Sequence, residues 1–251
     1  MAQSRLGELR IPVDGEWDME DLKQVSEGLS DTYGLFYPLV AEDEVVRERL
    51  QDALRDTFWS GNMDSRFLGE RLYRQIPRDE SLKLRSFHYS SPGAMTLAGV
   101  LSVLLLMAGV ATAWIKVGSN FIDLWDKVEK FFKERKHLQK PGKETELDDA
   151  MMLDSDEARG LVFEVGGQLG FTDKSCEVLI GVVGNPISAL KFLVCVGREG
   201  RKLSTMQREG KLALPAPPHE GIELRSSATA KKRMKGRVEV EIKKSRKPKS
   251  E

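Results

Sequence analysis

The chain has 251 residues, of which 40% are hydrophobic and 31% are charged, and its 39 Lys and Arg residues balance its 39 Asp and Glu residues. This composition is typical of a globular protein of one or two domains, and two cysteines exclude a disulfide-rich framework. The charge is uneven, because residues 231–251 contain ten Lys and Arg residues against three Glu residues. The basic end therefore differs from the mildly acidic remainder of the chain.

Residues 1–92 predict a small α+β domain with three strands. Leu9, Ile11 and Val13 alternate with polar or proline residues, which is a strand pattern, and Pro12 favours an edge position. Asp18 and Asp21 have the spacing of a helix capping box. The other predicted elements are a second strand at Thr32–Val40, helices at Glu42–Phe58 and Ser65–Ile76, and a last strand at Leu82–Tyr89.

Residues 93–115 are the longest uncharged stretch of the chain, and they predict a single transmembrane helix. A helix of this length is about 35 Å long at roughly 1.5 Å per residue, which is enough to cross the ~30 Å hydrocarbon core of a bilayer. The alternative is a buried helix in the core of an oligomer, because a helix that is apolar on all sides also suits a protein interior.

Residues 116–139 continue this stretch as an amphipathic helix with a heptad spacing of apolar residues. The two segments together predict one long helix that self-associates through small residues and through the heptad seam. The alternative is that the amphipathic half packs on a neighbouring domain or lies along a membrane surface. The residues predicted to mediate helix association are Ala98, Ser102, Gly109, Ala113, Phe121, Leu124, Val128 and Phe131.

Residues 140–154 predict a charged linker, and residues 155–214 predict a C-terminal module of three helices. Thr172 and the Asn185–Pro186 pair have the character of helix N-caps. The spacing of the first two helices also resembles a helix-turn-helix, although the second helix offers few side chains that suit base edges. We therefore expect a packing or docking module.

Residues 215–251 predict a Pro-rich break followed by a basic tail. Gly221–Arg225 and Arg237–Ile242 alternate cleanly, and these two segments predict a loose hairpin. The basic residues suit an anionic lipid surface or a nucleic acid. The predicted polyanion-binding residues are Lys231, Lys232, Arg233, Lys235, Lys243, Lys244, Arg246 and Lys247.

No catalytic motif is recognisable, so the sequence predicts a protein that is not an enzyme. His88, His137 and His219 lie in three different regions, and we expect no metal and no cofactor. A group of aromatic residues offers the alternative of a ligand pocket, although core positions are the simpler interpretation. This group consists of Tyr33, Tyr37, Phe36, Phe58 and Trp59.

The functional prediction is a membrane-anchored binding, adaptor or sensor protein that self-associates through its central helix. The expected location is a bacterial inner membrane, with the soluble domains mainly in the cytoplasm. The expected partners are membrane lipid, a second copy of the chain and an unidentified protein. The alternative is a soluble or peripheral nucleic-acid-binding protein that uses the helical module and the basic tail.

Overall fold

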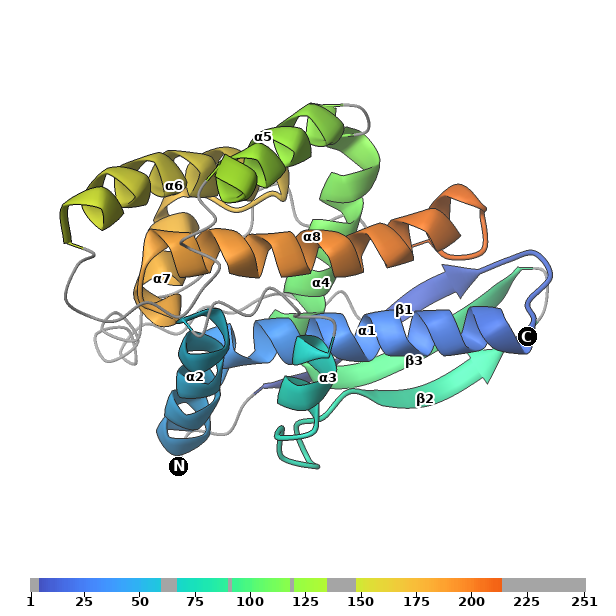
Figure 1. Cartoon of the computed structure of the whole chain (residues 1–251). Coiled ribbons are helices and arrows are strands. Elements are labelled where there is room, and N and C mark those ends of the chain that lie inside the picture. The colour runs from blue at the N-terminus through green and yellow to red at the C-terminus, as the bar shows by residue number, and fades with distance from the viewer. Residues whose placement is uncertain (1–4, 60–66, 90–91, 118–119, 135–147, 214–251) are drawn as a thin grey trace, which may run out of the picture.

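The computed structural model describes residues 5–59, 67–89, 92–117, 120–134 and 148–213. A three-stranded sheet lies along one side of a group of helices, and the predicted α+β class is confirmed (Figure 1). The elements are β1 (Leu6–Val13), α1 (Met19–Val40), α2 (Glu44–Trp59), α3 (Leu68–Tyr73), β2 (Lys83–His88), β3 (Gly93–Val100), α4 (Leu101–Val117), α5 (Asn120–Glu134), α6 (Asp148–Gln168), α7 (Asp173–Val183) and α8 (Pro186–Arg208).

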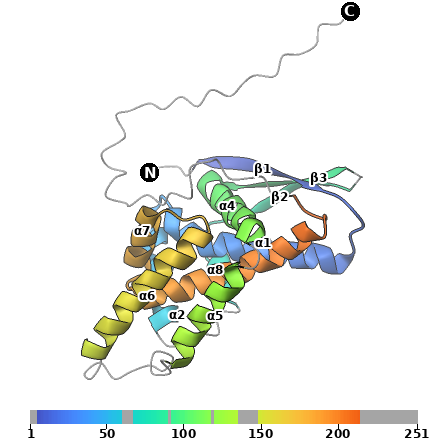
Figure 2. The same cartoon turned by 90° about the horizontal axis from the view of Figure 1, so that it is seen from above.

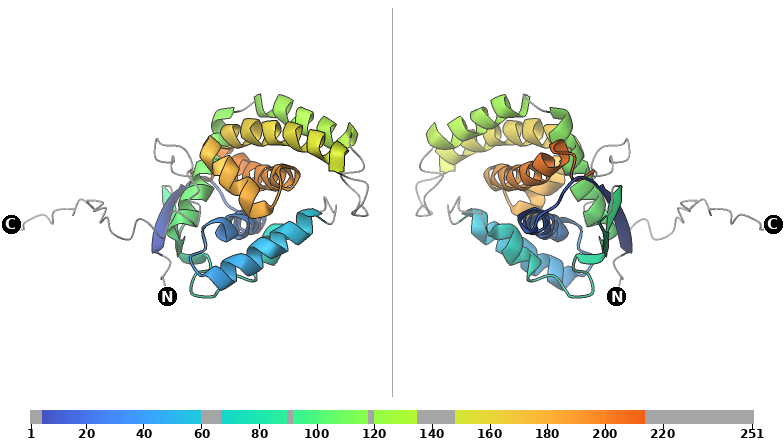
Figure 3. Two further views of the ribbon diagram at one scale, coloured as in Figure 1. Left: turned by 90° about the vertical axis from the view of Figure 1, so that its left-hand side faces the viewer. Right: turned by 90° about the vertical axis from the view of Figure 1, so that its right-hand side faces the viewer.

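The sheet is antiparallel and has the strand order β1-β3-β2, so β3 is its central strand. In β1, Ile11 and Val13 are buried on the inner face, whereas Arg10 and its alternate neighbours are exposed on the outer face. Successive residues of a strand point to opposite faces, which explains this alternation. Figures 2 and 3 show the helices on the inner side of the sheet only. Among the described residues, the sheet therefore has one face in the core and one open face.

The prediction of a single helix over residues 93–115 is wrong. Gly93–Val100 forms the central strand, and the helix α4 begins only at Leu101. Small side chains on the outer face of this central strand are shielded by the neighbouring strands, and without polar alternation its run of apolar residues resembles a buried helix. Here Ala94 and Ala98 occupy the outer face, and Met95 and Leu97 occupy the inner face.

The prediction of one continuous helix through residue 139 is also wrong, because α4 ends at Val117 and α5 begins at Asn120. Within the described ranges, no single helix combines the length and the apolar character that a membrane crossing needs. Only α7 and α8 taken together pass that test by length and composition, and their axes are bent by 109°. The stretch that predicted the transmembrane span is thus divided between the sheet and a shorter helix.

The predicted strand at Thr32–Val40 is wrong as well, because these residues complete the long helix α1. Its start was predicted correctly: the Asp18 side chain accepts a hydrogen bond from the Asp21 amide, and the Asp21 side chain accepts one from the Asp18 amide. The second half of α1 is buried on nearly all sides, so it lacks the polar face that marks a surface helix. Pro38 lies in the last turn, close to the end of the helix.

The three predicted C-terminal helices are confirmed as α6, α7 and α8. Thr172 caps α7, and Asn185 caps α8 with Pro186 in its first turn. The predicted linker is wrong at its end, because α6 already begins at Asp148, while residues 140–147 lie outside the described residues. The predicted Pro-rich break and basic tail, residues 215–251, also lie outside the described residues.

Helix α8 is the central helix of the fold, since it contacts α1, α2, α4, α6 and α7. It runs beside α1 between the sheet side and the outer helices α5 and α6 (Figures 1 and 2). The buried side chains of the sheet, α1, α4 and the C-terminal helices form one continuous cluster. The core of the predicted N-terminal domain and that of the helical module are therefore joined.

Candidate functional site

The residues predicted to mediate helix association are not gathered on one exposed surface. Ala98 lies in β3, whereas Ser102, Gly109 and Ala113 lie in α4, and of these four only Ser102 is exposed. The apolar face of α5 is used inside the chain, because Leu124, Val128 and Phe131 are each buried to 97% or more.

Helix α5 packs on α6, and the Lys127 ammonium lies 2.7 Å from the Glu164 carboxylate across this contact. The arrangement matches the alternative in which the amphipathic half packs on a neighbouring part of the protein. The side chain of Phe121 lies outside the described part of the structure. All the predicted polyanion-binding residues, from Lys231 to Lys247, also lie outside it.

The aromatic residues of α1 belong to the core. Tyr33, Phe36 and Tyr37 are fully buried, as the simpler interpretation predicted. The Tyr33 hydroxyl accepts a hydrogen bond from the Val100 amide at 2.8 Å and donates one to the Glu80 carbonyl at 2.5 Å. The Tyr37 hydroxyl donates to the Glu80 carboxylate. These bonds join α1 to the end of β3 and to the segment before β2, so they position the sheet on the helix.

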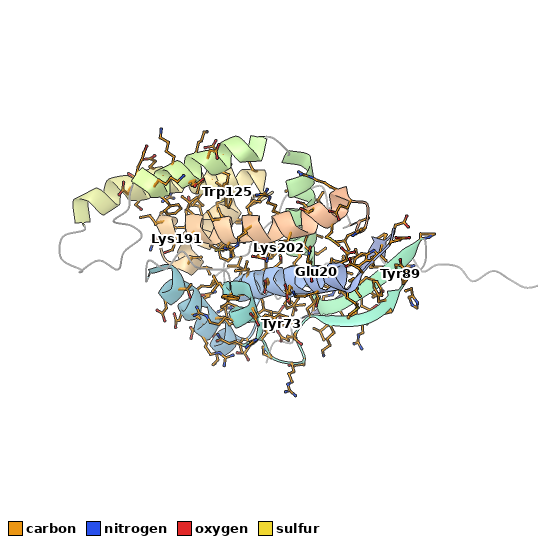
Figure 4. All side chains as sticks on the ribbon, turned by 45° about the vertical axis from the view of Figure 1, so that its right-hand side comes forward. Glu20, Tyr73, Tyr89, Trp125, Lys191 and Lys202 are labelled. Carbon is orange, nitrogen blue, oxygen red and sulfur yellow. The ribbon has the colours of Figure 1, made fainter. Side chains whose placement is uncertain are left out.

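A different aromatic group is exposed at the end of the sheet, where β2 ends and α1 begins. We call Trp17, Met19, Phe87 and Tyr89 the aromatic corner. The ring centroids of Trp17 and Phe87 are 5.7 Å apart in an edge-on arrangement, and those of Phe87 and Tyr89 are 6.4 Å apart and stacked. Met19 is 79% exposed and Tyr89 is 57% exposed, and Figure 4 shows Tyr89 at this end of the molecule.

Hydrogen bonds and a tight turn hold Trp17 of the aromatic corner in place. Gly15 has a φ of 74°, which suits glycine and allows the chain to turn directly after β1. The Trp17 ring nitrogen donates to the Asp14 carbonyl at 2.9 Å, and the Trp17 amide donates to the Tyr89 hydroxyl at 3.3 Å. The capping box then fixes the first turn of α1. The exposed side chains therefore project from an ordered backbone.

Sequence reasoning did not single out the aromatic corner. The available signal was positional: Trp17 directly precedes a helix cap, and Tyr89 directly follows a strand. Aromatic residues at such loop positions are candidates for surface recognition, because loops between rigid elements often carry binding residues. The pairing of β2 with β3 and of β3 with β1 brings these two positions together over 72 residues of sequence.

A cluster of charged side chains lies between the antiparallel helices α1 and α8. The Lys202 ammonium lies 2.6 Å from the Glu199 carboxylate and 4.0 Å from the Asp31 carboxylate. Both carboxylates are largely buried, and burial together with the nearby Glu199 charge raises the pKa of Asp31 to about 6. Arg198 also contacts Glu199, at 3.3 Å. This cluster ties the two helices together through the ion pairs of Lys202.

The ends of the same two helices are joined by a further ion pair. The Lys211 ammonium donates to both oxygens of Asp21, at 2.8 and 2.7 Å. These hydrogen bonds lower the pKa of Asp21 and raise the pKa of Lys211. The pair also holds the residues that follow α8 close to the end of β1.

The remaining reactive side chains of the described ranges lie in separate places. Within those ranges, no group of three or more His, Cys, Asp and Glu residues is placed to hold a metal ion. Cys176 and Cys195 are buried cysteines, and burial raises the pKa of Cys176 to about 11, which keeps its thiol protonated. His88 is exposed on the open face of β2.

No protein-family model, curated protein or solved structure matches this chain. Among the features described above, the aromatic corner combines exposure, rigidity and side chains that suit recognition.

Proposed function

We propose that this chain is a non-enzymatic binding or adaptor protein that contacts a protein partner through the aromatic corner. The observation that supports this proposal most strongly is the exposure of Tyr89, whose ring stacks on Phe87 beside Trp17, together with the exposure of Met19 two residues after Trp17. Trp, Tyr, Phe and Met are enriched in protein interfaces, because they bury a large area for few rotatable bonds.

The rigidity of the aromatic corner favours binding further. A partner that docks on side chains whose positions are already fixed loses less conformational entropy on binding. The two hydrogen bonds of Trp17 and the capping box at Asp18 provide this fixation before any partner arrives. Glu16 and Glu20 flank Trp17 and Met19 in sequence, and both are exposed.

Site-specific photo-crosslinking in the host cell tests this proposal. The photoreactive residue p-benzoylphenylalanine replaces Met19 in one variant and Val45 of α2 in the control variant. The two positions match well, because their side chains are 79% and 77% exposed. We expect a discrete adduct from position 19 and none from position 45.

The mass of the adduct identifies the kind of partner. An adduct of about twice the 28.2 kDa chain mass would indicate self-association through the aromatic corner. A heavier or lighter species would indicate a different protein. Equal labelling from both positions, or no adduct at either, would overturn the proposal.

A second candidate function is nucleic-acid binding, the alternative predicted from the sequence. The observation that favours it is the open face of the sheet, where Arg10, Lys83 and His88 are exposed. Together with the basic tail, this face would contact phosphates and release counterions. Binding to RNA or DNA should then weaken steeply with salt and be lost on deletion of residues 231–251.

The predicted membrane location has its own test. Membrane fractionation of the full chain, with carbonate and high-salt washes in parallel, separates an integral protein from a peripheral one. Retention through both washes would support an anchor. Release by salt alone would point to the basic tail as the membrane contact.

A further inference from the structure

β1 lies at one edge of the sheet, with β3 on one side of it. On its other side, the pairing shown by the described residues is confined to the end of the strand, where the Ala213 amide donates to the Pro12 carbonyl at 2.9 Å. From Leu6 to Ile11, no other part of the described chain pairs with this side. We call the backbone of Leu6–Ile11 on this side the β1 edge.

The backbone groups that line the β1 edge follow from the bond at Pro12. The Pro12 carbonyl points away from β3, and alternate residues of an edge strand point their amide and carbonyl groups to the same side. Glu8 and Arg10 therefore present both of their backbone groups to the β1 edge. A row of such groups is a template for pairing with another chain.

Glu8 and Arg10 also carry opposite charges on one face of β1. Both side chains are exposed on the open face of the sheet, and Leu9 between them is on the inner face. Among the described residues, neither charged side chain forms an ion pair. If a second copy of β1 pairs antiparallel about Leu9, the order of these residues is reversed in that copy. Glu8 of each copy then lies opposite Arg10 of the other.

We propose that two copies of this chain pair antiparallel along the β1 edge, with a two-fold axis at Leu9, which goes beyond the proposed function. Glu8 of one copy and Arg10 of the other form a pair that exchanges both of its backbone hydrogen bonds, and the axis repeats this pair. The two Leu9 side chains meet on the inner face, beside the core against which Leu9 already packs. The two three-stranded sheets thereby form one continuous sheet.

The other edge strand, β2, shows why charge favours β1 for this contact. Lys83 and Arg85 flank Leu84 with the same two-residue spacing, and both are exposed. Symmetric pairing of two copies about Leu84 would set Lys83 opposite Arg85. Like charges directly opposite each other destabilise a pair of strands, whereas opposite charges stabilise it. Charge complementarity therefore selects a second copy of β1 as the partner of the β1 edge.

Charge reversal in the full chain, followed by sedimentation equilibrium, tests this pairing. The wild type should form a species of twice the 28.2 kDa chain mass. Arg10→Glu makes both charged positions acidic, and Glu8→Arg makes both basic. Because like charges then meet at both symmetric pairs, we expect the dissociation constant of each variant to rise by about tenfold or more. An equimolar mixture of the two variants should dimerise like the wild type, since each acidic residue then faces a basic one.

The exchange of both charges provides the matched control. Glu8→Arg combined with Arg10→Glu restores opposite charges at both pairs and should dimerise like the wild type. A wild type that stays monomeric, or single variants that dimerise as tightly as the wild type, would refute the proposal. If the single variants dissociate but neither the mixture nor the double exchange restores the dimer, this register is wrong.

Disulfide formation gives a second readout of the register. In a non-hydrogen-bonded antiparallel pair the Cα atoms are about 4.5 Å apart, so two Leu9→Cys chains should be linked across the axis. The control is Leu6→Cys, because Leu6 is 56% exposed. In this register the two copies of position 6 are six residues apart along the paired strands, which is about 20 Å at ~3.4 Å per residue.

We expect at least tenfold more disulfide-linked dimer from Leu9→Cys than from Leu6→Cys, although Leu6 is the more exposed position. The native Cys176 and Cys195 are both buried. Equal linking of the two variants, or more linking from Leu6→Cys, would contradict a two-fold axis at Leu9.

Discussion

The contact between α1 and α3 depends on two facing glycines. We therefore predict that a Gly→Ala substitution lowers the free energy of unfolding at this contact and raises it at an open position of a helix. A Cβ at Gly34 would overlap the Gly69 carbonyl oxygen and would lie 2.9 Å from the Tyr73 amide nitrogen. A Cβ at Gly69 would lie 2.6 Å from the Asp31 carbonyl oxygen. By contrast, a Cβ at Gly160, in the interior of α6, would meet no atom within 4 Å.

The magnitude follows from comparing Gly34→Ala with Gly160→Ala. Both substitutions gain about 0.5–1 kcal/mol, because alanine loses less backbone entropy than glycine in a helix. Only Gly34→Ala must also push α3 away, and overpacking of this kind costs about 1–3 kcal/mol. The free energies of unfolding of the two variants should therefore differ by about 1–3 kcal/mol, with Gly160→Ala more stable than the wild type.

Urea unfolding monitored by circular dichroism measures both variants against the wild type. A change in midpoint at constant slope reports a change in stability alone. If Gly34→Ala proves as stable as Gly160→Ala, the close approach of α1 and α3 described here is incorrect.

Three further predictions follow from buried polar groups. Tyr33→Phe leaves the Val100 amide and the Glu80 carbonyl without the Tyr33 hydroxyl, and we expect a loss of about 2–3 kcal/mol in urea unfolding. Tyr73→Phe, which removes the hydrogen bond from the Tyr73 hydroxyl to the Leu82 carbonyl, should cost less, and an equal or smaller cost for Tyr33→Phe would contradict the assignment. The pKa of Asp31 is raised from its usual 3.8 to about 6, so the folded protein binds more protons than the unfolded chain between these values. Stability from this group therefore falls as pH rises from about 4 to 6, by ~3 kcal/mol, and Asp31→Asn should lack this component when unfolding is measured at pH 4 and pH 7. Finally, the Cys176 thiol should resist iodoacetamide at pH 7.5 in the native protein and react after urea unfolding, and rapid native labelling detected by peptide mass spectrometry would show that it is accessible.

Local signals in the sequence were sufficient for several elements. The Asp18 capping box, the Thr172 cap and the Asn185–Pro186 pair each act within one helical turn, so their residues carry the information by themselves. The alternation of apolar and polar residues in β1 likewise indicated a buried face and an exposed face. Each of these predictions depended on residues that are close together in the sequence.

The sequence by itself therefore determined the α+β class, the starts of α1, α7 and α8, and the edge strand. It did not distinguish a strand from a helix where nearly all residues are buried, as in Gly93–Val100 and in the second half of α1. A continuous apolar run shows neither the period of a strand nor that of a helix. Residues 93–100 form a strand because β1 and β2, which lie far away in the sequence, pair with β3 on either side. The same long-range pairing created the aromatic corner. Only the tertiary structure could decide these features, because hydrogen-bonded partners distant in sequence leave no local pattern.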